Sequence, residues 1–599
     1  MTAIAEAPRK ASIRRPRRGN RRPKLLAPRL QTLFALPPKL LASRFYRRMI
    51  QPLYRSGLYA ATLGVRSSGE LAALPFDVWP ADERNGMALL HGEFRCGAEL
   101  VRNPKPLHNA VGISETWQAW MAGFAWLDDL RALGGPATRQ TARQLILAWF
   151  AETATYDSFT WRADHLAARL RRCLMNAAFL EVNSDALFRA HLLRSLNRQA
   201  EHLSRALPDG LIGSELIKAV IALMIAGALL PQGTSQGERG GDKWLRRGQA
   251  LLERELAAQI LPDGGHIERS PAVMLELLEH LLDLAQVLIL TRRPLPDQLA
   301  SCIENLASAL RVTVHPDGAL ALFNDSSEVT SVEVALALTR AASLRGAELR
   351  ELGQLPHSGF QRLTAGKTII IADAGAPPPH GYDAHAHAGT LSFEMSHAGE
   401  RIIVNCGAHP VAPEWRAVQG ASAAHSTLVV DDTNSSMLLP PDGTSSGGLA
   451  LTPKSVLARR EATEAGQWLD LRHNGYEEPF GLIHRRRLFL SADGYELMGE
   501  ETLAGRGGNS FALRLHLHPA VQASVTQNGQ AAFLKLPGSA AAGGAWRLRV
   551  QGGDLSLADS IYLGHKGQVR RTQQLLVLGF IEGDETQVKW ALQKEGVRR

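Results

Sequence analysis

The densest group of chemically versatile side chains lies between Tyr382 and Pro410, in the stretch YDAHAHAGTLSFEMSHAGERIIVNCGAHP. Residues i and i+2 of an extended segment point the same way, so His385 and His387 can address one site. His425 begins the later segment AAHSTLVVDD and can bring a third imidazole close. Three imidazoles near strand ends suit a zinc site or a general base with an orienting partner. The alternative is that these histidines are simply exposed in loops and form no site.

A second group lies in LRHNGYEEPFGLIHRRRLFL and contains two imidazoles, a phenol and two guanidinium groups (His473, Tyr476, His484, Arg485 and Arg486). Guanidinium groups bind carboxylates through paired hydrogen bonds, as an acidic substrate requires. Strand alternation places Arg485 opposite His484 and Arg486, so these three side chains cannot all face one cleft. The alternative is a charged outer face of a sheet.

A third group, LPDGGHIERSP, places His266, Glu268 and Arg269 in a loop between two helical segments. Ligand-binding groups often gather in loops at one rim of a helical layer. A plain turn followed by a helix starting at Ser270 or Pro271 would produce the same pattern.

Two kinds of element must position these groups. From about Thr116 to Arg350 apolar residues recur at helical spacing, in segments separated by short Pro, Gly and Asp motifs. After about Gln354 the period is two, with turn residues at intervals of about ten residues, which is typical of an antiparallel sandwich. We therefore predict a helical domain over 51–353 and a β-sandwich domain over 354–599.

The positive charge is concentrated at the N-terminus. The 599-residue chain has a formal net charge of +9, and its first thirty residues contain ten Lys or Arg and one Glu. The rest of the chain is neutral overall, so we expect no nucleic acid to bind the folded body. Residues 1–50 are predicted to form a basic, disordered tail, which either keeps the chain soluble or contacts nucleic acid, anionic lipid or an acidic protein.

Several classes of protein are excluded by pattern. The longest apolar run, Ala219 to Leu230, is about half the ~20 residues of a transmembrane helix, so we expect no membrane-spanning segment. The four cysteines lie far apart and form no CxxC pair, so the spacing supports neither a zinc ribbon nor a disulfide framework. No phosphate-binding loop, HExxH motif or dinucleotide fingerprint is present.

Two features together, DGGHIERSP and AHAHAGTLSFEMS…RIIVNCG…AAHSTLVVDD, resemble the heparinase II/III family of bacterial polysaccharide lyases. The resemblance covers roughly residues 110–580. It implies an N-terminal incomplete (α/α) toroid, a C-terminal antiparallel β-sandwich, and a cleft between them for an anionic polysaccharide. The resemblance also implies that the protein is located in the cell envelope or periplasm. An N-terminus without a convincing signal peptide instead favours a cytoplasmic location. Neither the glycan nor the oligomeric state follows from the sequence.

The resemblance also implies roles for the histidines. His385 matches a catalytic or substrate-contacting imidazole, while His387 and His425 match ligands of a structural zinc ion. Asn405 stands where the family usually has an aspartate ligand. Because an amide is a weaker zinc ligand than a carboxylate, a metal here would lose much of its charge compensation.

Family lyases act by β-elimination, which removes the proton alpha to a uronate carboxylate. The family often has a Tyr-His pair after ERSP, but this chain has Ala272, Val273 and Met274. We therefore assign proton transfer to His385 with Tyr476 or Tyr382. Arg269 or Arg416 would hold the carboxylate, and the remaining predicted substrate contacts are His266, Glu268 and His473. A hydrolase on the same scaffold and a non-catalytic anionic-glycan-binding protein are the alternatives.

Overall fold

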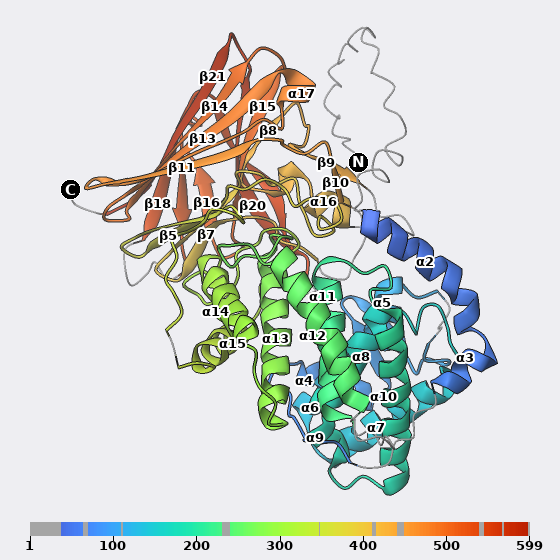
Figure 1. Cartoon of the computed structure of the whole chain (residues 1–599). Helices are drawn as coiled ribbons and strands as arrows, with labels where there is room; N and C mark the ends of the chain where they lie inside the picture. Colours follow the sequence, from blue (N-terminus) through green and yellow to red (C-terminus); the bar gives the residue numbers. More distant parts are fainter. Residues whose placement is uncertain are drawn as a thin grey trace, which may run out of the picture.

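The computed structural model describes residues 38–63, 70–108, 112–230, 240–346, 348–409, 415–439, 448–537, 544–565 and 568–596. Helices form the N-terminal part and strands the C-terminal part, as Figure 1 shows from blue to red. The predicted fold class, a helical part followed by an antiparallel sandwich, is confirmed. A short hairpin, β1 (Glu93–Cys96) and β2 (Glu99–Arg102), lies within the helical part and was not predicted.

The helical part packs around a single large apolar core. Its centre is α11 (Gly213–Leu229), which is buried along nearly its whole length and contacts α8, α12 and α13. The apolar run read from the sequence is therefore a core helix, and no helix in the described ranges is long and apolar enough to cross a bilayer. The remaining helices are α2 (Pro38–Tyr54), α3 (Gly57–Thr62), α4 (Glu83–Leu90), α5 (Glu115–Ala122), α6 (Trp126–Leu133), α7 (Pro136–Glu152), α8 (Ala163–Met175), α9 (Ala177–Glu181), α10 (Ala186–Ala206), α12 (Gly240–Gln259), α13 (Pro271–Leu290), α14 (Asp297–Val312) and α15 (Ser331–Ser343).

The predicted tail is not uniform. Residues 38–50 of the range 1–50 belong to helix α2, whereas residues 1–37 lie outside the described residues. The segment α2–α3 is held to the helical part by a small aromatic cluster that includes Tyr54, Tyr59 and Trp161. Side-chain packing therefore orders the end of a segment whose composition indicated disorder.

Two antiparallel sheets form the C-terminal part. One runs in the order β11-β12-β13-β14-β21-β18-β17-β16, and the other in the order β19-β20-β15-β7-β6-β5-β4-β3 with β8 paired to β15. Their bounds are β3 (Gln354–Leu355), β4 (Phe360–Ala365), β5 (Thr368–Asp373), β6 (Phe393–His397), β7 (Glu400–Val404), β8 (Leu428–Val430), β11 (Val456–Thr463), β12 (Gly466–His473), β13 (Leu482–Ser491), β14 (Glu496–Gly505), β15 (Ser510–Leu517), β16 (Gln522–Val525), β17 (Ala531–Lys535), β18 (Ala545–Gln551), β19 (Asp554–Tyr562), β20 (Arg570–Phe580) and β21 (Glu585–Lys594). Shorter elements are β9 (Met437–Leu439), β10 (Gly448–Ala450), α16 (Arg416–Gln419), η2 (Ser422–Ala424) and α17 (Glu477–Phe480).

Buried polar contacts join the two parts. Arg269, just before α13, donates through Nε to the carbonyl of Ser358 at 2.6 Å and pairs with Asp373 at the end of β5. Nearby, Glu394 of β6 lies 3.0 Å from Nε2 of His315 and accepts the backbone N–H of Leu322 at 3.1 Å. Because these groups are buried and paired, they set how the sheet meets the helices.

Candidate active site

The candidate site lies where the helical part meets the sandwich, around a loop between α14 and α15. Asn324 and Asp325 both have positive φ, 47° and 58°, a conformation that Asn and Asp tolerate better than most residues. The Asn324 side chain donates to the carbonyl of Arg269 at 2.8 Å and accepts the backbone N–H of His387 at 3.0 Å. Asn324 therefore ties the loop to both halves of the molecule.

The carboxylate of Asp325 is the centre of the cluster. It lies 3.2 Å from Nδ1 of His385 and 2.7 Å from Nε2 of His387, and it pairs with Arg416. Gln419 donates to it at 3.0 Å. Burial raises the pKa of this carboxyl, but the charges of His387 and Arg416 outweigh burial and hold the pKa well below its usual range. Asp325 is therefore a fixed negative charge.

His385 is the accessible imidazole of the cluster, with 37% of its side chain exposed. Its contact with Asp325 places a proton on Nδ1 and leaves Nε2 as the reactive nitrogen. Nε2 lies 3.8 Å from the Glu268 carboxylate, beyond hydrogen-bonding distance. Burial lowers the pKa of His385, but the hydrogen bond to Asp325 and the charges of Asp325 and Glu268 raise it overall. The arrangement is a histidine oriented by a carboxylate, as general acid–base chemistry requires.

Glu268 lies beside His385, and Tyr382 lies close to Gly213 on the same side as Glu268. Glu268 is buried and accepts the backbone N–H of Ser214 at 2.7 Å. Gly213 has φ +67°, and a Cβ there would lie 2.2 Å from Oε1 of Glu268 and 3.7 Å from Cδ1 of Tyr382, so the close approach needs glycine. Burial and the charges of Glu255 and Glu268 raise the pKa of Tyr382, so its phenol keeps its proton at neutral pH.

The residues predicted to bind zinc meet only in part. Nδ1 of His387 lies 3.2 Å from Nε2 of His425, and Nδ1 of His425 contacts the carbonyl of Ala421 at 2.8 Å. Asn405 uses both ends of its amide elsewhere: it donates to Glu394 at 3.2 Å and accepts the N–H of Ser426 at 3.0 Å.

In the described part of the chain no three His, Cys, Asp or Glu residues could jointly hold a metal. Because both ends of its amide are hydrogen-bonded elsewhere, Asn405 does not fit as the third ligand. Zinc binding by His387 and His425 stays a prediction.

Two predicted residues lie in the sandwich core, away from solvent. Tyr476 is fully buried and donates its hydroxyl to the carbonyl of Leu428 at 3.0 Å. His473 is 1% exposed, and its Nε2 lies 3.2 Å from Nδ1 of His484. Neither side chain can reach a bound glycan, which corrects the proton-transfer role predicted for Tyr476 and the substrate contact predicted for His473.

Three predicted substrate contacts on the helical side and in α16 hold the structure together instead. His266 is fully buried beside Gln259, with 3.1 Å between Nε2 and the amide oxygen. The guanidinium of Arg269 donates to the carbonyls of Ser358 and Ala376 and pairs with Asp373. The guanidinium of Arg416 pairs with Asp325 and donates to the carbonyl of Ala384 at 2.6 Å. Because their donors are used, these side chains do not hold a substrate carboxylate in this arrangement.

Asn324, Asp325 and Gln419 were missed by the sequence reasoning. The signal available was weak, since Asn324 and Asp325 are consecutive polar residues after the buried segment LALF. Nothing in spacing links them to His385, which lies 60 positions after Asp325.

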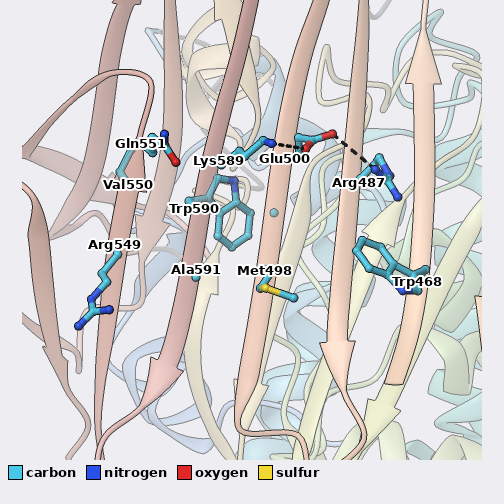
Figure 2. Close-up of a pocket in the computed structure, with 11 residues that line it drawn as sticks. Trp468, Arg487, Met498, Glu500, Arg549, Val550, Gln551, Lys589, Trp590 and Ala591 are labelled. Atoms are coloured by element: carbon cyan, nitrogen blue, oxygen red, sulfur yellow. Dashed lines mark ion pairs between the residues drawn. The ribbon is translucent and has the colours of Figure 1, made fainter. Parts of the chain in front are cut away.

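A separate hollow of about 320 Å³ lies on the outer face of the eight-stranded sheet, the one with β11 and β16 at its edges. Figure 2 shows Trp468, Arg487, Met498 and Lys589 at this face. Glu500 pairs with Arg487 at 3.6 Å and with Lys589 at 3.3 Å, so two basic groups of this hollow share one carboxylate. The hollow contains none of the residues of the Asp325 cluster.

Comparisons with known proteins agree along the chain. The family model described as heparinase II/III N-terminus matches residues 140–346, and the model described as heparinase II/III-like, C-terminal, matches residues 347–591. FtsZ-localized protein C of Caulobacter vibrioides (strain NA1000 / CB15N) is 30% identical over 560 residues, which cover 90% of this chain and 93% of that protein.

Solved structures share the fold, and two of them serve as examples. One is heparinase III, with a TM-score of 0.67, 14% identity and coverage of 94% of this chain and 93% of that one. The other is a mutant of the heparan sulfate lyase HepC from Pedobacter heparinus, with a TM-score of 0.59, 16% identity and coverage of 94% and 91%.

Proposed function

Because the chain belongs to the heparinase II/III-like family, we propose that it cleaves a uronic-acid-containing anionic glycan by β-elimination. The observation that carries this proposal is the accessible imidazole of His385, oriented by Asp325 and with Nε2 unused. A carboxylate-oriented imidazole with one free nitrogen can take a proton from carbon.

The reaction needs a base and an acid. Nε2 of His385 takes the proton alpha to the uronate carboxylate, and the electron pair forms a carbon–carbon double bond as the glycosidic C–O bond breaks. Asp325 stabilises the imidazolium so formed. The phenol of Tyr382, which keeps its proton at neutral pH, donates that proton to the departing oxygen.

The test follows the ultraviolet absorbance of the unsaturated product while the purified chain is incubated with a panel of uronate polymers. We expect a rise with at least one polymer, and a loss of about a hundredfold or more in kcat for His385→Ala. His357→Ala is the matched control, since His357 is exposed and no hydrogen bond of its side chain is found among the described residues. Tyr382→Phe should also slow the reaction, with Tyr495→Phe as its control.

Other outcomes would reject the proposal. Reducing ends released without the absorbance would indicate a hydrolase on this scaffold. Binding of a polymer without either product would indicate a non-catalytic glycan-binding protein.

The relative from Caulobacter supports a second proposal, that this chain associates with FtsZ, because that relative is named as FtsZ-localized and is similar over nearly the whole chain. Purified chain should sediment with FtsZ polymers formed with GTP and stay in the supernatant with unpolymerised FtsZ. Equal sedimentation in both conditions, or none, would reject this proposal. It is independent of the elimination chemistry.

A further inference from the structure

A cavity of about 590 Å³ lies between α7 and α10, in a part of the helical domain that supplies no residue of the Asp325 cluster. One wall is apolar and is formed by Leu147, Phe150, Leu187 and Phe188. Leu187 is 75% exposed and Leu147 is 38% exposed, so this wall opens to solvent at its rim. The volume lies in the range of small-molecule sites.

The cavity lining also contains basic side chains. His191, Arg194 and Arg198 lie on one face of α10, because residues three, four and seven positions apart in a helix are neighbours. Within the described ranges, the side chains of His191 and Arg194 form no hydrogen bond or ion pair. Arg198 lies over the Trp161 ring at 5.9 Å and donates to the carbonyl of Ala154 at 3.4 Å, so it contacts no carboxylate there.

The carboxylate lining this cavity, that of Asp185, is used to cap α10. It accepts the backbone N–H of Phe188 at 2.6 Å. The basic side chains of the cavity therefore outnumber its acidic one.

The floor of the cavity holds a buried cation. Arg169 is 1% exposed, and its guanidinium donates to three neutral acceptors: Gln199 Oε1 at 2.9 Å and the carbonyls of Ala122 at 2.6 Å and Thr160 at 3.2 Å. No ion pair to a carboxylate is found for it among the described residues. Burial lowers the pKa of this arginine to about 10, which reflects the cost of a charge with hydrogen bonds but no counter-ion.

We propose that this cavity binds a small organic acid, with its carboxylate beside Arg194 and Arg198 and its apolar part against Phe150 and Leu187. The anion balances the charge of the α10 arginines and of Arg169 beneath them. The apolar part covers side chains that are otherwise partly exposed to water. A neutral or cationic compound of the same shape would make the apolar contacts but would not balance the charge of the arginines.

Three probes of one shape separate charge from shape: 1-naphthoate, 1-naphthol and 1-naphthylmethylammonium, titrated into the full chain by calorimetry. We expect naphthoate to bind at least about tenfold more tightly than the other two. The double variant Arg194→Glu/Arg198→Glu should bind naphthoate at least about tenfold more weakly.

The matched control is Arg139→Glu/Arg189→Glu, which makes the same change in net charge on α7 and α10 but outside the cavity lining. Its affinity for naphthoate should stay within about twofold of the wild type. If the control loses as much affinity for naphthoate as the cavity variant, the effect is due to net charge alone, and the proposal is overturned.

A further variant keeps the test valid if the double variant folds poorly. Leu187→Asp changes an exposed residue in the first turn of α10, where an acidic side chain favours the helix. It should weaken naphthoate binding about tenfold by repelling the anion and removing apolar contact. Equal affinity for all three probes, or no binding of naphthoate by the wild type, overturns the proposal.

Discussion

Two clusters in this protein combine a carboxylate, imidazoles and a guanidinium. At the junction, Asp325 contacts His385, His387 and Arg416. In the sandwich, Glu501 lies 2.8 Å from Nε2 of His484 and 2.8 Å from Nε of Arg486. Residue types alone do not distinguish the two.

Exposure to solvent and the use of the imidazole nitrogens do distinguish them. In the sandwich cluster the side chains of His484, Arg486 and Glu501 are fully buried, and both ring nitrogens of His484 are used. At the junction, by contrast, His385 is partly exposed, and its Nε2 lies 3.8 Å from the Glu268 carboxylate. A polar network buried away from solvent stabilises a fold, whereas an imidazole with a free nitrogen beside solvent can act on a ligand.

The largest expected effect is on stability in the sandwich cluster. Arg486→Met leaves the buried charge of Glu501 without its guanidinium partner and should lower the free energy of unfolding by about 3–5 kcal/mol. The control is Arg485→Met, because Arg485 lies on the opposite, exposed face of β13 and pairs there with Asp470. This change should lower the free energy of unfolding by less than about 1 kcal/mol. Urea denaturation measures both, and equal losses would contradict the distinction between the two faces.

The next effect is on catalysis at the junction. Asp325→Asn removes the charge that orients His385, so kcat should fall by about a hundredfold. Because Asp325 raises the pKa of His385, the wild-type rate should fall as pH drops through a value above 6.5, and in the variant that acidic limb should move to lower pH. A pH–rate profile measures this shift, and an unmoved limb would show that His385 is not the titrating base.

A smaller effect concerns a buried imidazole on the helical side. Burial lowers the pKa of His266 to about 3, so below pH 6.5 the unfolded chain binds a proton that the folded chain does not, and stability falls as the pH falls. Between pH 6.5 and pH 4.5 the wild type should lose about 2 kcal/mol more than His266→Gln. Equal losses of the two proteins in urea denaturation would show that His266 does not contribute.

The smallest expected effect concerns zinc. Since Asn405 is used by Glu394 and Ser426, His387 and His425 would have to hold the ion without a third protein ligand, and binding should be weak. We therefore expect elemental analysis after dialysis to find less than one zinc per wild-type chain, and less still in His387→Ala. One zinc per wild-type chain that survives dialysis would show that another ligand completes the site.

Local pattern in the sequence determined the elements and their faces. The change of period near residue 354 separates helices from strands, and alternation along β13 buries His484 and Arg486 while exposing Arg485. These features follow from neighbouring residues, because backbone geometry fixes which side chains share a face. The stretch AHAHAG, which contains His385, likewise located the imidazole that lies beside Asp325.

Only the tertiary structure decided which polar groups are free. The sequence made Arg269 and Tyr476 candidate site residues. In the structure, both donate hydrogen bonds to backbone carbonyls of residues far away in the sequence. Asp325 reaches His385 from 60 positions away through a loop with positive φ. The burial and partners of a single polar side chain depend on long-range contacts, which no local period encodes.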